Sequence, residues 1–259
     1  MNILNIIEDI SKSDPEVYER LDSRRSMFKK AGQFAGKIAL TTLPFTLGTM
    51  FNKAYGKPAD VVLDTLNFAL TLEYLESEFY TQGLAASGLI PTADRAIFQQ
   101  IGKHEVAHVN FLKMAISGAG GTPVAKPAFD FSGAKGSNNG PYKDYLTNYQ
   151  TFLALSQAFE DTGVRAYKGQ AGNLITSNDV ITAALQIHSV EARHAAEVRR
   201  LRGVKGWITG KTTDIPTVQA VYNGEENTNQ GGVTVANTEA FDEPLDKDAV
   251  LKIVGPFIV

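Results

Sequence analysis

The stretch Glu105-Val-Ala-His108 decides the fold of this chain, because its pattern, E-x-x-H, returns once as Glu191-Ala-Arg-His194. A further glutamate precedes each copy at a similar distance: Glu73 stands 32 residues before the first, and Glu160 stands 31 residues before the second. Positions i and i+3 share one face of a helix, so each copy presents a carboxylate and an imidazole together. One carboxylate plus E-x-x-H, occurring twice on four helices, predicts a two-metal site inside a helical bundle.

The two halves of the chain align as an internal repeat. Glu73 corresponds to Glu160 and Tyr80 to Tyr167 at a spacing of 87 residues, and the two E-x-x-H patterns correspond at a spacing of 86. The one-residue difference falls in a predicted hairpin loop. The repeat therefore predicts a pseudo-twofold axis through the bundle, with two equivalent metal positions beside it.

The residue types suit the chemistry of such a site. In each E-x-x-H pattern the glutamate bridges two metals and the histidine binds one of them, while each isolated glutamate completes one metal position. Four carboxylates offset the charge of two divalent ions, and neutral imidazoles leave coordination positions for dioxygen or peroxide. The predicted ligands are Glu73, Glu105, His108, Glu160, Glu191 and His194.

Two tyrosines recur with the isolated glutamates. Tyr80 and Tyr167 each follow their glutamate by seven residues, which is two turns along the same helix face. Core packing is one interpretation. Because both recur symmetrically, we also predict that each hydroxyl bonds a ligand carboxylate from the opposite helix and orients it for catalysis.

Three further residues compete for a place in the site. Glu76 lies on nearly the same face as Glu73, but its repeat counterpart is Gly163, which can bind nothing, so Glu73 is preferred. His104 has no counterpart in the repeat and is predicted to lie on the surface. His188 is interpreted as a helix-surface residue, and lining the approach to the site is the alternative.

Composition narrows the class of protein. The chain has 259 residues, 43% of them hydrophobic, which is enough for one domain with a substantial core and attachments. The net charge of -3 shows no excess of basic residues of the kind that binds nucleic acid, so no nucleic-acid partner is expected. The absence of cysteine excludes disulfides, thiolate metal sites and iron–sulfur clusters. Any metal is therefore held by oxygen and imidazole nitrogen, which suits iron, manganese or zinc.

The first 56 residues are predicted to be an export leader and not part of the fold. Ser23-Arg-Arg-Ser-Met-Phe-Lys29 resembles the twin-arginine motif, and a moderately apolar stretch, residues 31–51, follows it. Gly56 marks a candidate cleavage position. A membrane anchor or a docked helix is the alternative, and Lys37 disfavours the anchor. This interpretation implies the twin-arginine export machinery as a partner and the bacterial periplasm or cell envelope as the location.

Periodicity and breakers organise the rest of the chain. The irregular stretch 118–141 can reach roughly 70–80 Å when extended. A helix of about 26 residues is only about 39 Å long, so this stretch can serve as the single long crossover of a bundle. The tail, residues 203–259, is mostly irregular, with one short helix near 246–254 and an apolar end that should pack back onto the bundle. The bundle domain, residues 57–202, is predicted to contain helices at 59–84, 92–118, 142–168 and 176–202, the last with a capping box at Thr176-Ser-Asn-Asp179.

The first predicted helix carries a family resemblance. Leu66-Asn-Phe-Ala-Leu-Thr-Leu-Glu73, with Tyr80 seven residues on, is similar to the first-helix ligand motif of bacterioferritins. The longer phrase, residues 72–80, with the leader and tail, resembles exported ferritin-like proteins related to plant desiccation-associated proteins. The resemblance covers residues 58–202. It implies an all-α, ferritin-like four-helix bundle with one long crossover, the same six ligands, and two iron or two manganese ions.

The function expected from these features is that of a di-metal carboxylate protein of the cell envelope. It would react iron or manganese with dioxygen or peroxide, as a ferroxidase-, peroxidase- or manganese-catalase-like oxidoreductase. Metal storage or sequestration, and a stress-protective bundle without turnover, are the alternatives. The protein could form a homo-oligomer, but the long tail argues against a hollow storage shell.

Overall fold

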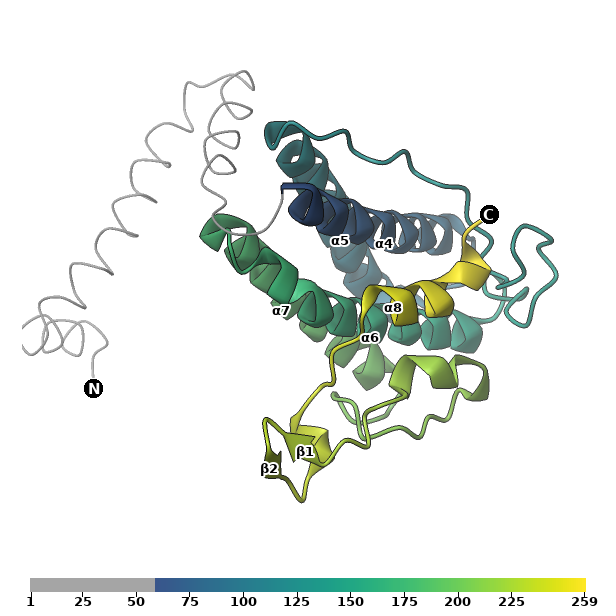
Figure 1. Ribbon diagram of the computed structural model, residues 1–259. Coiled ribbons are helices and arrows are strands. Elements are labelled where there is room, and N and C mark those ends of the chain that lie inside the picture. Colours follow the sequence, from purple (N-terminus) through teal and green to yellow (C-terminus); the bar gives the residue numbers. More distant parts are fainter. Residues whose placement is uncertain (1–58) are drawn as a thin grey trace, which may run out of the picture. The chain divides into compact units, whose positions relative to one another are not determined.

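The computed structural model describes residues 59–259, and its core is four long helices. α4 pairs with α5, α6 pairs with α7, and α4 packs against α6, whereas α5 and α7 approach each other more sparsely (Figure 1). The predicted all-α four-helix bundle is confirmed. The predicted leader lies outside the described residues. The helices are α4 (Ala59–Ala85), α5 (Thr92–Gly118), α6 (Tyr149–Leu174) and α7 (Asn178–Leu201).

Two apolar clusters fill the bundle and leave a polar layer between them. One contains Phe79 and Phe152, whose rings stack with centroids 4.8 Å apart. The other contains Leu70, Leu112 and Ile187. On α5 and α7 the predicted ligands fall in the sequence between the residues of the two clusters, whereas on α4 residues of both clusters alternate around Glu73. The layer of candidate ligands thus lies between two apolar clusters. The burial of their apolar side chains is the main source of stability in such a fold.

The crossover between α5 and α6 is longer than predicted, because α6 begins at Tyr149 and not near Tyr142. Asn148 caps the helix, its side chain accepting hydrogen bonds from two backbone N–H groups of the first turn. Before it, the Asp130 carboxylate accepts backbone N–H bonds of 2.8–3.0 Å from residues 132, 136 and 138. Tyr142 stacks on Phe257 instead of joining the helix.

The ends of α6 and α7 also differ from the prediction. α6 continues past Gly169 to Leu174, so this glycine does not end the helix. It allows the C-terminal segment to approach closely, because a Cβ at this position would lie 1.8 Å from the backbone oxygen of Leu245. The capping box predicted at Thr176 is wrong. The N-cap of α7 is Ser177, and its side chain makes no capping hydrogen bond.

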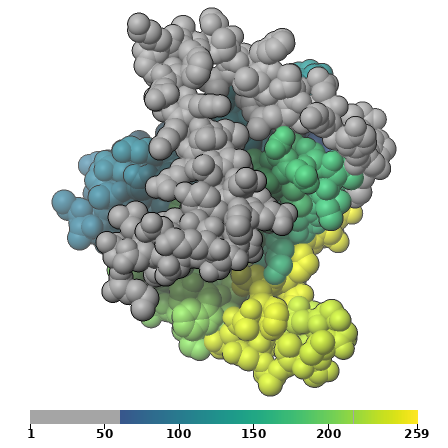
Figure 2. Space-filling model, turned by 90° about the vertical axis from the view of Figure 1, so that its left-hand side faces the viewer, coloured from purple at the N-terminus to yellow at the C-terminus, as the bar shows by residue number. Residues whose placement is uncertain are grey.

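The C-terminal segment runs along the outside of the bundle and returns to the crossover. α8 packs on α6, and the last residues pair with the crossover through a bridge between Phe129 and Ile258 (Figure 1). In the space-filling view this segment, yellow-green to yellow, forms a lobe beside the bundle (Figure 2). No helix in the described part of the chain is long and apolar enough to cross a membrane. Its elements are η1 (Pro216–Tyr222), β1 (Asn229–Gln230), β2 (Val233–Thr234), η2 (Thr238–Ala240), α8 (Lys247–Val254) and η3 (Gly255–Phe257).

Candidate metal centre

All six residues predicted as ligands lie in one buried cluster at the middle of the bundle. Each of the four long helices contributes one glutamate, and all four glutamates are 0% exposed. α5 and α7 add one histidine each. The cluster consists of two overlapping groups whose ligand atoms lie within 4.8 Å of one another, Glu73, Glu105, His108 and Glu191, and Glu105, Glu160, Glu191 and His194.

The first group is centred on His108. Its Nδ1 lies 3.2 Å from an oxygen of Glu73, 3.3 Å from one of Glu105 and 3.0 Å from one of Glu191. One nitrogen thus faces three carboxylates that come from three different helices. Such a set of hard oxygens and one imidazole suits a first-row divalent ion.

The second group repeats this geometry around His194. Its Nδ1 lies 2.9 Å from Glu105, 3.2 Å from Glu160 and 3.4 Å from Glu191. Glu105 and Glu191 occur in both groups, and each turns one carboxylate oxygen to His108 and the other to His194. They therefore have the geometry of bridging ligands between two positions.

Two tyrosine hydroxyls hold the outer glutamates. Tyr167 on α6 donates a 2.5 Å hydrogen bond to Glu73 on α4, and Tyr80 on α4 donates a hydrogen bond to Glu160 on α6. The bonds cross between the two central helices in opposite directions. Burial and the neighbouring carboxylates raise the pKa of both hydroxyls, so each keeps its proton and remains a donor.

Burial and mutual repulsion control the protonation of the cluster. Burial, with the charge of Glu191, raises the pKa of Glu73 to about 8. Burial opposes a charge on His108 as well, but the three carboxylates close to its Nδ1 outweigh this and raise its pKa to about 12. Burial likewise favours protonated Glu191, but the nearby imidazoles of His108 and His194 lower its pKa to about 2. In the metal-free protein, Glu73 and His108 therefore keep protons at the positions where cations would bind.

The donor set fits a pair of metal ions, because several of its atoms have no hydrogen-bond partner among the described residues. Both oxygens of Glu105, both oxygens of Glu191, one oxygen of Glu160 and the Nδ1 of His194 are buried and unpartnered. Buried carboxylate oxygens in this state are costly unless a cation neutralises them. A pair of divalent ions held by these residues would supply that neutralising charge.

A fifth carboxylate, Glu76, lies beside the cluster. It is only 3% exposed, and a Cβ added to Gly163 would be 3.2 Å from its Oε1 and 3.6 Å from the Cγ of Glu191. Burial and the four ligand glutamates raise its pKa well above the usual range. The small residue opposite Glu76 thus leaves the space that its carboxyl group fills.

The remaining histidines are both engaged. His104 was predicted to be a surface residue; it is partly exposed, but its Nδ1 also lies 2.9 Å from the Nε2 of His194, a contact that was not predicted. The fold brings α5 and α7 together there, which no spacing within one helix predicts. His188 is half-buried, and its Nδ1 lies 3.0 Å from the carbonyl oxygen of Val164 on α6.

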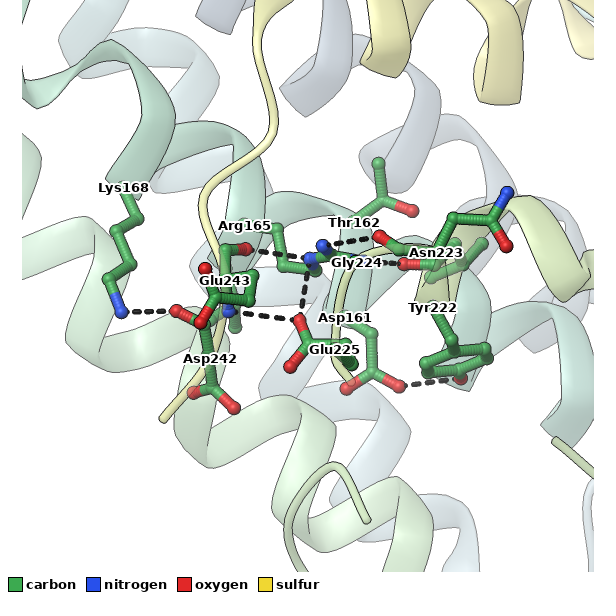
Figure 3. Close-up of polar contacts among 12 residues, drawn as sticks. Asp161, Thr162, Arg165, Lys168, Tyr222, Asn223, Gly224, Glu225, Asp242 and Glu243 are labelled. Carbon is green, nitrogen blue, oxygen red and sulfur yellow. Dashed lines mark hydrogen bonds and ion pairs between the residues drawn. The ribbon is translucent and has the colours of Figure 1, made fainter. Parts of the chain in front are cut away.

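Sequence reasoning missed a second buried cluster, in which the C-terminal segment is tied to α6. The guanidinium of Arg165 donates to the backbone oxygens of residues 221, 223 and 243 and pairs with Glu225 at 2.8 Å (Figure 3). Nearby, Asp161 accepts bonds from Arg199 and from the hydroxyl of Tyr222. Because Arg165 lies between Glu160 and Tyr167 on α6, this clamp holds the helix that carries both. The contacts join residues 38 to 78 positions apart, so local pattern gave no signal.

Comparison with known protein families finds a match over the bundle. A family model described as a ferritin-like domain matches residues 61–204, which is more than half of the chain and includes all six candidate ligands. No curated protein matches the chain.

Proposed function

The chain belongs to the ferritin-like domain family, and from this premise we propose that it holds two iron or two manganese ions and uses them in redox chemistry with dioxygen or peroxide. The proposed ligands are Glu73, Glu105, His108, Glu160, Glu191 and His194. The observation that carries the proposal is the set of unpartnered carboxylate oxygens turned toward two histidine nitrogens. A cluster serving only to stabilise the fold would satisfy those atoms internally, since buried polar groups are normally hydrogen-bonded.

Two ions that each change by one oxidation step would supply the two electrons that, with two protons, reduce hydrogen peroxide to two water molecules. The residues of the chain prepare the position for this chemistry. Tyr80 and Tyr167 hold the outer carboxylates by hydrogen bonds, so that those groups need not reorganise when charge changes. The apolar clusters on both sides exclude bulk water and strengthen every charge interaction in the layer.

Metal analysis and oxidant consumption test the proposal in sequence. Protein purified from its native host should contain about two transition-metal ions per chain. Reloaded with Fe(II) or Mn(II), it should consume dioxygen or peroxide, and turnover should continue when excess Fe(II), another reductant or a second peroxide molecule returns the ions to the reduced state. Glu105→Gln combined with Glu191→Gln should abolish both binding and consumption. Glu197→Gln, on α7 at a side chain that is 37% exposed and paired with Arg200, serves as the matched control. Failure to bind either metal would refute the proposal, whereas stoichiometric binding without turnover would favour storage or sequestration.

We also propose that the protein acts in the periplasm or cell envelope after twin-arginine export. The support is the sequence of residues 1–56 alone, with Arg24 and Arg25 at its centre. Because this route carries folded proteins, it would allow metal loading before export. Fusing residues 1–56 to a reporter that is active only outside the cytoplasm tests the proposal. Replacing both arginines by lysine should abolish the signal, and a signal that survives would contradict this route.

A further inference from the structure

His104 breaks the symmetry of the candidate metal centre. The ring planes of His104 and His194 differ by only 14°, with centroids 5.2 Å apart, and their facing nitrogens are 2.9 Å apart. The contact is therefore directed along the ring planes, where an imidazole N–H and a lone pair both point. It meets the outer nitrogen of His194, the one turned away from the carboxylates, and not the inner nitrogen that faces them.

This contact controls which nitrogen of His194 is free to bind a metal ion. A neutral imidazole carries one proton, and a ligand histidine must carry it on the nitrogen that does not bind. If Nε2 of His194 donates to Nδ1 of His104, then Nδ1 of His194 is left as a lone pair aimed at the cluster. The proton of His104 then lies on its own Nε2, which is 2.6 Å from the side-chain amide nitrogen of Gln100. This tautomer requires the Gln100 amide to be turned by half a rotation, so that its oxygen and not its nitrogen faces His104 and accepts.

In the described part of the chain, the half of the site around His108 has no such contact to its outer nitrogen. None of the hydrogen bonds of His108 in the described part of the chain involves its Nε2. The repeat position that corresponds to His104 is Val190 on α7, which can neither donate nor accept a hydrogen bond. Val190 and His104 line the same hollow of about 380 Å³ between α5 and α7, together with Gln100 and His194. The two halves thus share their candidate ligands but differ in what supports the histidine.

We propose that His104 makes the two metal positions unequal by fixing the tautomer and orientation of His194, so that the position containing His194 binds its ion more tightly. His104 is a positioning residue here, because it acts through His194. Outer hydrogen bonds of this kind typically change metal affinity by roughly 10–100-fold. The inference rests on the proposed two-metal site, but it concerns the difference between the positions and not their existence.

Anaerobic titration with cobalt(II), followed by its visible absorption, measures the two affinities directly. In the native protein we expect two binding steps separated by roughly 10–100-fold. His104→Val should weaken the tighter step until the two merge, and His104→Gln should restore much of the separation, because the amide oxygen can accept from His194. Val190→His should instead tighten the weaker step. The double exchange, H104V with V190H, should restore two separated steps.

Proton NMR of the cobalt-loaded protein gives a second readout. The N–H protons of ligand imidazoles appear as shifted, exchangeable signals. We expect one of them to exchange slowly in the native protein and to lose this protection in His104→Val. His188→Leu, which removes the other unrepeated histidine, should leave both readouts unchanged.

The outcomes separate the two levels of the argument. If the native protein binds no cobalt, the two-metal site itself is refuted. If it binds two ions and His104→Val leaves the steps and the slow signal unchanged, only the role of His104 is refuted. Should His104→Val fail to fold, as judged by circular dichroism, Val190→His decides alone: an unchanged weaker step would contradict the inference.

Discussion

Raising the pH from about 5 to about 8 should destabilise the metal-free protein strongly, while the metal-loaded protein should show no such loss. Glu73 is fully buried, and its pKa of about 8 in the folded chain compares with 4.5 for an ordinary glutamate. Between these values the folded state keeps a proton that the unfolded chain releases. The stability contribution of that proton is present below about 4.5 and is lost as the pH rises toward 8.

The size of the effect follows from the shifts. One pKa unit corresponds to about 1.4 kcal/mol, so Glu73 alone should cost about 3 kcal/mol of unfolding free energy between pH 5 and 8. His108, raised from 6.5 to about 12, acts in the same direction. Its contribution is complete below 6.5, and its loss begins above that pH and adds about 2 kcal/mol by pH 8. Glu191, lowered to about 2, changes its contribution only below about 4.5 and leaves this window unaffected.

Thermal unfolding of chelator-treated protein at a series of pH values measures the effect. A loss of about 5 kcal/mol corresponds to a fall in melting temperature of roughly 10–20 °C for a domain of this size. Metal loading should reverse the trend, because the ions replace the protons and bind more tightly as the pH rises. In Glu73→Gln the slope between pH 5 and 6.5 should become shallower by the share of Glu73, while Glu76 and Glu160, whose pKa values burial also raises, keep the remainder.

A metal-free profile that stays flat or rises from pH 5 to 8 would refute the reasoning. It would mean that the carboxylates and histidines of the cluster neutralise one another in the folded chain, and that the buried layer does not store protons in place of cations.

Two further predictions concern the supports of the site. Tyr167→Phe removes the donor to Glu73 and should weaken metal binding at that position by roughly 10–100-fold with an unchanged helical content, measured by competition with a chelator; an unchanged affinity would contradict the orienting role. Arg165→Met leaves Glu225 buried without its charge partner and should destabilise the protein by about 3–5 kcal/mol in denaturant titration, with proteolysis appearing first in residues 205–245. Gly169→Ala checks this independently and should also destabilise the protein, because the added Cβ would lie 1.8 Å from a backbone oxygen of the same segment. If the C-terminal segment is only loosely attached, neither variant should change the unfolding free energy.

The fold and the grouping of the candidate ligands could be predicted because both depend on local periodicity. Glu105 and His108 share a helix face whatever the rest of the chain does, and the repeat supplied the pairing with Glu191 and His194. The start of α6 was missed for the opposite reason. Tyr142 is apolar at helical spacing, yet its ring stacks on Phe257, which lies more than 100 residues further along the chain. No window of local sequence contains that contact.

The clamp around Arg165 was beyond prediction for a similar reason. A lone arginine in a helix pattern ordinarily indicates a solvated face, and its burial depends on carbonyl groups that the C-terminal segment brings from a distance. Gly169 gave a false signal through the same segment: its missing side chain reflects a close approach by Leu245 and not the end of a helix.

The residues that reasoning from the repeat set aside are the ones that distinguish the two halves of the centre. Glu76 was ranked below Glu73 because its counterpart is glycine, yet that glycine is what makes room for the buried carboxyl group. His104 was assigned to the surface because its counterpart is Val190, yet it bonds the outer nitrogen of a candidate ligand. A repeat identifies what two halves share, and a shared set of ligands can only give two equal positions. Any division of roles between two metal ions must therefore come from positions where the repeat fails, and in this chain those positions lie directly against the ligand layer.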